Sequence, residues 1–213
     1  MSGSRNLPNI ITIGRILACP AIFAMAMSSS VGMRYGAFVL FVIAGLSDLW
    51  DGYLARKHGW ITDVGKLLDP LADKLLLLST FVPFYLISHR GGDEWLVPGW
   101  GMLPMWVMIV IFGREILVTI FRQWAAHRKV VIAAGRSGKY KAFIQNLFAG
   151  GLLLWYPLKE SAKALGWGGL PWGAWTLLHS SWIGVTLGLA LVLTVYSMFD
   201  YLWSYRGLIG VRV

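Results

Sequence analysis

Four aspartates interrupt two apolar segments that are otherwise long enough to cross a lipid bilayer. Asp48 and Asp51 lie in the first segment, and Asp69 and Asp73 lie in the second. An acidic side chain at the centre of a membrane costs about 2.5–3.5 kcal/mol, so four of them cost on the order of 10 kcal/mol. A fold that places all four in or near a membrane must compensate this cost. Divalent cations are one such compensation, and carboxylate-bound cations often serve phosphate chemistry.

The composition is that of a membrane protein. Hydrophobic residues make up 57% of the 213 residues and charged residues only 14%, unlike a typical soluble domain. The 12 Trp and 25 Gly residues suit membrane interfaces and close helix packing. A single cysteine, Cys19, excludes an intrachain disulfide. The net charge of +9 comes mostly from residues between apolar segments, which indicates membrane topology rather than nucleic-acid binding.

Six apolar segments are long enough to span a bilayer if the few charges inside them are functional. They cover residues 8–29, 34–57, 67–88, 102–126, 138–157 and 181–204. Residues 158–180 are rich in Gly, Pro and Trp, and we expect them to form an interfacial loop. The sequence therefore predicts an all-α integral membrane protein with six transmembrane helices and one domain (1–213). We expect the first segment to be a retained helix rather than a cleaved signal peptide.

The distribution of loop charges predicts that both chain ends face the cytoplasm. With the N-terminus inside, the inner side collects twelve basic residues: Arg5, Arg15, Arg56, Lys57, Lys66, Arg128, Lys129, Arg136, Lys139, Lys141, Arg206 and Arg212. The outer side collects four: Arg34, Arg90, Lys159 and Lys163. The acidic run then lies at the cytoplasmic ends of the second and third helices. We expect a bacterial inner membrane, with an organelle membrane as the alternative.

The spacing of the acids predicts that they converge. Asp48 and Asp51 are three residues apart and Asp69 and Asp73 four apart, so each pair shares one face of a helix. A short turn between the two helices makes them antiparallel neighbours, so that both acidic faces can line one pocket. Aspartate oxygens suit Mg²⁺, Mn²⁺ or Ca²⁺ rather than zinc.

Simpler explanations exist for parts of this pattern. Asp69 followed by Pro70 is a common helix start, and Asp48 and Arg56 could form a structural ion pair. A cation transporter is an alternative function, but its acids would be spread through the membrane depth on facing repeats. The acids here cluster at one end of the helices, which favours a metal-binding pocket.

The same residues carry a resemblance to a known family, the CDP-alcohol phosphatidyltransferases. The family pattern D-x2-D-G-x2-A-R-x8-G-x3-D-x3-D is met at every spacing by Asp48, Asp51, Gly52, Ala55, Arg56, Gly65, Asp69 and Asp73. The family's N-terminal P-N-x2-T-x2-R is similar to the stretch formed by Pro8, Asn9, Ile10, Ile11, Thr12 and Arg15. The resemblance implies six membrane helices, a polar cavity open to the cytoplasm, and a homodimer.

Two shorter stretches resemble the bacterial phosphatidylglycerophosphate synthases within that family. They are Gly113-Arg114-Glu115-Ile116-Leu117 followed by Arg122, and Gly138-Lys139-Tyr140-Lys141 followed by Gln145. Buried arginines need anionic partners, so we expect Arg114 and Arg122, with Lys139 and Lys141, to hold the phosphate of an acceptor. For the arginines, the alternative is a structural ion pair between helices with Glu115. For the lysines, the alternative is that they only mark the cytoplasmic side of the membrane, as the positive-inside rule expects.

The resemblance implies that the phosphatidyl group of CDP-diacylglycerol is transferred to an alcohol, with release of CMP. Glycerol 3-phosphate is the expected acceptor, with inositol phosphate, serine or phosphatidylglycerol as alternatives. By resemblance, Asp48, Asp51 and Asp69 bind two Mg²⁺ or Mn²⁺ ions, and Asp73 is the general base with a share in the metal site. The expected contacts to CDP come from Asp48, Gly52, Ala55, Arg56, Thr62 and Gly65. The residues expected to border the cavity are Asn9, Thr12 and Arg15.

Overall fold

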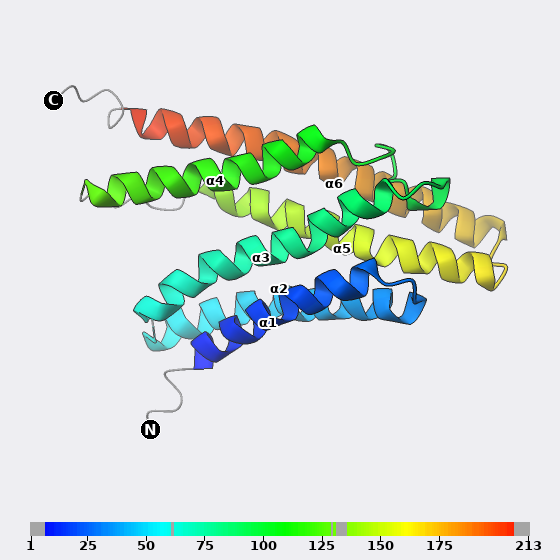
Figure 1. The fold of residues 1–213 in the computed structure, drawn as a ribbon, viewed down its shortest axis with the longest axis horizontal. Coiled ribbons are helices and arrows are strands. Elements are labelled where there is room, and N and C mark those ends of the chain that lie inside the picture. The colour runs from blue at the N-terminus through cyan, green and yellow to red at the C-terminus, as the bar shows by residue number, and fades with distance from the viewer. Residues whose placement is uncertain (1–6, 61, 129, 131–135, 207–213) are drawn as a thin grey trace.

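The described residues form six long α-helices that run back and forth along one axis (Figure 1). The structure is a computed structural model, which describes residues 7–60, 62–128, 130 and 136–206, apart from the side chains of residues 55, 56, 63, 66 and 136. The elements in chain order are α1 (Leu7–Met27), α2 (Val31–His58), α3 (Asp63–Ser88), the short 3-10 helix η2 (Asp93–Trp95), α4 (Met105–His127), α5 (Arg136–Ala164) and α6 (Gly169–Ser204). The predicted all-α architecture is confirmed.

Two helix boundaries near the acidic run follow from local chemistry. After α2, Gly59 adopts a φ of +67°, a conformation that glycine tolerates and that stops a helix. The Thr62 side chain then caps α3, because its hydroxyl oxygen accepts a hydrogen bond from the Gly65 N–H over 3.0 Å. Since α3 begins at Asp63, Asp69 lies inside the helix. The alternative that Asp69 and Pro70 merely start a helix is therefore wrong.

The predicted loop over residues 158–180 is also wrong. α5 continues to Ala164 and α6 already begins at Gly169, so that only a short turn separates them. Two glycines with positive φ, Gly166 and Gly169, allow this tight turn. Pro171 lies in the first turn of α6, where a missing backbone N–H costs little, and the following apolar residues continue the helix. Gly and Pro in this segment thus mark a turn and a helix start.

Four helices contain stretches that are long and apolar enough to cross a membrane, as far as the described residues show. They are Leu7–Met27, Val31–Leu54, Leu67–Ser88 and Gly169–Ser204. In α4 the apolar run is interrupted by Arg114, Glu115 and Arg122. Large apolar side chains are exposed on the outside of the bundle, for example Leu17, Leu67 and Leu178. A surface of this kind suits lipid rather than water, so the chain is a helical membrane protein.

The helices pack as two connected groups. α1 packs against α2 and α3, α6 packs against α4 and α5, and α2 packs against α5 between the two groups. In Figure 1, α1 and α2 lie below α4, α5 and α6, and α3 rises from the lower left to the upper right. Phe81 and Phe84 of α3 meet Phe148 of α5 in the fully buried core. Because successive helices alternate in direction, the start of α1, the end of α2 and the start of α3 meet at one end of the bundle. α4 ends and α5 begins toward the same end, so all predicted site residues share that half.

Candidate functional site

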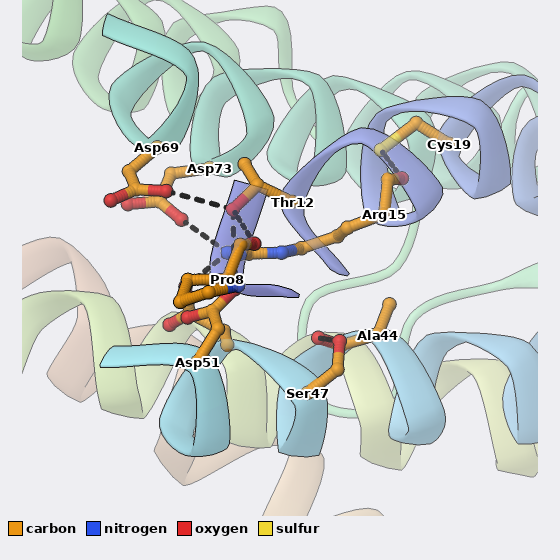
Figure 2. A network of polar contacts seen from close by, with 10 residues as sticks. Pro8, Thr12, Arg15, Cys19, Ala44, Ser47, Asp51, Asp69 and Asp73 are labelled. Carbon is orange, nitrogen blue, oxygen red and sulfur yellow. Dashed lines mark hydrogen bonds and ion pairs between the residues drawn. The ribbon is translucent and has the colours of Figure 1, made fainter. Parts of the chain in front are cut away.

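One buried arginine gathers three of the predicted acids. Arg15 of α1 projects between α2 and α3, and its side chain has no exposed surface. Its Nη1 donates to Asp48 and, over 3.3 Å, to Asp73, whereas its Nη2 donates to Asp51 over 2.7 Å. Figure 2 shows Asp51 on one side of the guanidinium and Asp73 on the other. A single cation from α1 therefore joins carboxylates of two further helices.

Thr12, one turn before Arg15, brings in the fourth acid. Its hydroxyl lies 3.0 Å from Asp69 Oδ1, 3.3 Å from Asp51 Oδ2 and 3.0 Å from the carbonyl oxygen of Pro8. A hydroxyl has one proton to donate, so these three acceptors share it. The four aspartates predicted to converge are thus brought together, and two residues of α1 connect them.

The acidic cluster is open on one side. The Asp51 side chain is 6% exposed, but that of Asp48 is 42% and that of Asp73 is 64% exposed. Asp69 is exposed as well. One buried carboxylate and three accessible ones form an acidic surface that solutes can reach. Four carboxylates against one guanidinium leave a formal charge of −3 at this surface.

The donor set of this cluster suits divalent cations. Each aspartate uses only one of its two oxygens in the described contacts to Arg15 and Thr12, so further oxygens remain available. Hard carboxylate oxygens are the ligands that Mg²⁺ and Mn²⁺ prefer. Among the described residues, no three His, Cys, Asp or Glu side chains are arranged to hold a metal ion. In the described geometry, the Arg15 guanidinium lies between Asp51 and Asp73.

A second contact ties α1 to the start of α3. Thr62 donates from its hydroxyl to Asn9 Oδ1 over 2.8 Å while it caps α3. A Cβ atom at Gly65 would lie 2.9 Å from Asn9 Oδ1, closer than real Cβ contacts, and 3.1 Å from Thr62 Oγ1, which is tight. Gly65 therefore leaves room for the hydrogen bond between Thr62 and Asn9, and a larger residue would have to displace the Asn9 side chain. Asn9, predicted at the cavity border, lies in this contact beside the acidic cluster.

Of the other residues predicted to contact CDP, Gly52 is half-buried and follows Asp51 directly. Ala55 and Arg56 continue α2, but their side chains lie outside the described part of the structure. The described partner of Asp48 is Arg15 of α1.

The predicted acceptor residues divide into two groups. Glu115 of α4 accepts from Lys141 of α5 and, over 3.2 Å, from its neighbour Arg114. The ion pair between an arginine and Glu115 that was the alternative is therefore present, but Arg114 and Glu115 both lie on α4. The ion pair that joins two helices is formed by Lys141 instead. Lys141 is buried and lies within electrostatic range of Asp73, whereas Lys139 is exposed. The first group thus lies within electrostatic range of the acidic cluster through Lys141.

Arg122 forms the second group with a residue that the sequence did not indicate. Its guanidinium carbon lies 5.8 Å from the ring centre of Tyr201 on α6, and Tyr201 is buried. Within the described part of the chain, Arg114 Nε, Arg122 Nε and the Tyr201 hydroxyl are buried without a hydrogen-bond partner. Tyr201 belongs to no sequence motif. The only signal of its role in the sequence is that it is a polar aromatic residue at the end of an apolar span. Unpaired donors between α4 and α6 suit an anion.

Comparisons with known proteins agree with this geometry. The sequence model of the CDP-alcohol phosphatidyltransferase family matches residues 5–196. The CDP-diacylglycerol–glycerol-3-phosphate 3-phosphatidyltransferase of Rickettsia felis is 37% identical over 151 residues, which cover 70% of this chain and 75% of the relative. The Bacillus subtilis enzyme of the same name is 37% identical over 163 residues, covering 70% and 77%. The probable phosphatidylglycerophosphate synthase of Mycobacterium tuberculosis is 32% identical over 212 residues, covering 97% and 85%.

Proposed function

Because the chain belongs to the CDP-alcohol phosphatidyltransferase family, we propose that it transfers the phosphatidyl group of CDP-diacylglycerol to glycerol 3-phosphate. The products are phosphatidylglycerophosphate and CMP. The acceptor hydroxyl oxygen forms a bond to the lipid-linked phosphorus, and the bond from that phosphorus to the CMP oxygen breaks. The observation that carries the proposal is the convergence of the four family aspartates around Arg15 and Thr12. The relatives' names supply the acceptor.

Asp48, Asp51, Asp69 and Asp73 would hold Mg²⁺ or Mn²⁺, with two ions expected. When bound, such ions neutralise the pyrophosphate and stabilise the charge that develops on its oxygens. The unengaged oxygens of the cluster and its formal excess of negative charge support this assignment.

Asp73 is the best-placed general base of the three aspartates that Arg15 contacts. Its side chain is the most accessible of the three that Arg15 contacts, and its contact to Arg15 is the longest of those three. It can therefore meet an acceptor hydroxyl and take its proton as the new bond forms. Lys141, one of the residues proposed to hold the acceptor phosphate, lies within electrostatic range of it.

The phosphate of the acceptor would be held by Arg114, Arg122, Lys139 and Lys141. Glu115 neutralises one of these charges and fixes Lys141 and Arg114, so the group keeps a positive excess. The unpaired Nε atoms of Arg114 and Arg122 support an anion-binding role. The CDP moiety would lie on the other side of the aspartates, against Asp48, Gly52, Ala55, Arg56, Thr62 and Gly65.

We place this site at the cytoplasmic face of a bacterial inner membrane, in a cavity between six transmembrane helices, with both termini inside. The excess of basic residues at the end of the bundle that carries the acids supports this orientation. The chain would form one domain (1–213) and act as a homodimer, as the family resemblance implies. Membrane lipid surrounds it and delivers the donor.

An acceptor screen tests the function. Purified protein in lipid nanodiscs would receive CDP-diacylglycerol, Mg²⁺ or Mn²⁺, and one alcohol from a panel of glycerol 3-phosphate, inositol phosphate, serine and phosphatidylglycerol. We expect CMP release only with glycerol 3-phosphate, together with a lipid product of matching mass. Faster release with another alcohol would reassign the acceptor, and no release with any alcohol would refute the transferase function.

A further inference from the structure

We propose that Arg15 is a tethered counter-cation of the acidic cluster: it holds the metal-free pocket together and competes with divalent cations for the same carboxylates. The inference rests on the proposed function in one respect, namely that the cluster binds divalent cations. It adds a role for a residue of α1 that lies outside the acidic motif itself.

The acidic cluster needs a compensating positive charge. Asp48 and Asp51 of α2 face Asp73 of α3 across the guanidinium, and each is within hydrogen-bond distance of it. Like charges this close repel one another, and Asp51, the most buried of the three, is screened least by solvent. Arg15 is fully buried and is the described cation that contacts all three, so it offsets this repulsion while no other cation is bound.

The Arg15 guanidinium has few partners besides these carboxylates. Its Nη1 and Nη2 are engaged only by carboxylates in the described contacts, and its Nε is buried without a partner. A divalent cation that draws these carboxylates to itself therefore removes the partners of the guanidinium. Positive charge beside the bound cation also opposes its binding. Both effects make Arg15 lower the affinity of the pocket for metal.

Thr12 provides a contrast within the same network. It contacts Asp51 and Asp69 through a neutral hydroxyl, so it connects the helices without adding charge. A merely structural role of Arg15 would resemble that of Thr12, and its loss would then lower stability without improving metal binding. The two roles are distinguishable by experiment.

The test compares wild-type protein with Arg15→Gln, which keeps polar donors but removes the charge. Two quantities are measured without substrates: the thermal unfolding midpoint in chelator and in Mn²⁺, and the Mn²⁺ affinity from the signal of free Mn²⁺ in electron paramagnetic resonance. In chelator, Arg15→Gln should unfold at a lower temperature than wild type. It should bind Mn²⁺ about tenfold more tightly, because a unit positive charge has left the pocket. Mn²⁺ should therefore raise its midpoint more than that of wild type.

Arg34→Gln is the matched control. Arg34 is another buried arginine paired with a carboxylate, Glu160 at 2.5 Å, but it lies at the opposite end of the bundle. Its replacement should lower the midpoint in chelator and leave Mn²⁺ affinity unchanged. Equal or weaker Mn²⁺ binding by Arg15→Gln would overturn the proposal.

Arg15→Lys keeps the inference testable if Arg15→Gln does not fold. Lysine keeps the charge but offers one ammonium in place of a fork, so its Mn²⁺ affinity should lie between those of wild type and Arg15→Gln. Affinity equal to or weaker than wild type would count against the proposal. The readouts also separate the two proposals: tight Mn²⁺ binding without CMP release would refute the transferase function alone, whereas wild-type protein that binds no Mn²⁺ would refute the counter-cation role.

Discussion

The four aspartates differ in how firmly the protein holds them. Asp51 is almost fully buried and receives hydrogen bonds from both Arg15 and Thr12, whereas Asp73 is largely exposed with one long contact to Arg15. A carboxylate that is already hydrogen-bonded by a cation is a weaker base than one that is free to turn toward a substrate. The difference favours a structural and ligand-holding role for Asp51 and a proton-accepting role for Asp73.

Asp73→Asn should abolish turnover while it largely preserves Mn²⁺-dependent binding of CDP. The amide keeps the size of the side chain but cannot accept the proton, a loss that typically lowers the rate by about 10²–10⁴-fold. CMP release measures turnover, and calorimetry measures CDP binding. Near-normal turnover of this variant would contradict the assignment of the base.

Arg122→Ala should raise the KM for glycerol 3-phosphate far more than the KM for CDP-diacylglycerol. A charge-assisted hydrogen bond to phosphate contributes about 1.5–3 kcal/mol, so an increase of roughly tenfold to hundredfold is expected. Arg128→Ala is a suitable control, because Arg128 caps the same helix and its guanidinium lies over Trp124. Equal changes in both KM values for Arg122→Ala would refute the proposed role of Arg122 in binding the acceptor phosphate.

At the scale of helices, the start of α3 depends on a tight fit against α1. Thr62 caps α3 and at the same time donates to Asn9, and Gly65 leaves the room that this contact needs. The same approach of the two helices carries Thr12 to Asp69 and Arg15 to Asp73. The packing of α1 against α3 therefore sets the geometry of the acidic cluster.

Gly65→Ala should destabilise the protein by about 1 kcal/mol, because the added Cβ meets Asn9 Oδ1 at 2.9 Å and displaces it from the Thr62 hydroxyl. Gly14→Ala is the control: it lies on α1, where a Cβ has no neighbour within 4 Å, and it should leave stability unchanged or slightly raised. The unfolding midpoint in detergent measures both. Asn9→Ala combined with Gly65→Ala should recover part of the loss, and a Gly65→Ala variant as stable as wild type would contradict the close-contact argument.

The sequence predicts correctly those features of the site that depend only on residue spacing along one helix. The three- and four-residue intervals placed each pair of acids on one face. The prediction that the short turn makes α2 and α3 direct neighbours is wrong, because α1 packs against both helices and connects them. The sequence did not predict that Arg15 joins the acids, because that contact depends on how α1 packs, 33 residues away from Asp48. The contact of Tyr201 was not predicted for the same reason, because its neighbour Arg122 lies on another helix. Gly and Pro around residue 170 suggested a loop, although one short turn sufficed.

At the scale of the whole molecule, charged residues with different tasks occupy opposite ends of the bundle. The acids and the basic residues of α4 and α5 lie at one end. At the other, Arg34 of α2 donates to Glu160 of α5 over 2.5 Å and to the Ser28 carbonyl oxygen over 2.8 Å, and its guanidinium lies 4.4 Å from the ring centre of Trp95. This contact ties α2, α5 and η2 together, far from the proposed chemistry.

Arg34→Ala should therefore lower stability and leave both KM values unchanged. Because Glu160 is partly exposed, the loss should be about 2–3 kcal/mol, less than for a fully buried pair. Thermal unfolding and steady-state kinetics on the same preparation provide the measurements. A selective rise in either KM would show that the two ends of the bundle are coupled.

The length of α6 has a consequence for how the protein sits in its membrane. Its 36 residues extend over about 54 Å, nearly twice the roughly 30 Å of bilayer hydrocarbon. Trp172, Trp175 and Trp182 lie in its first four turns, at the end opposite to the acids, and tryptophan favours the headgroup region. The part of α6 that exceeds the hydrocarbon thickness thus lies among the lipid headgroups of the leaflet opposite to the acids, or the helix tilts so that more of it fits within the hydrocarbon. Either way, the α5–α6 turn anchors one side of the molecule and sets the depth at which the aspartates meet the opposite lipid surface.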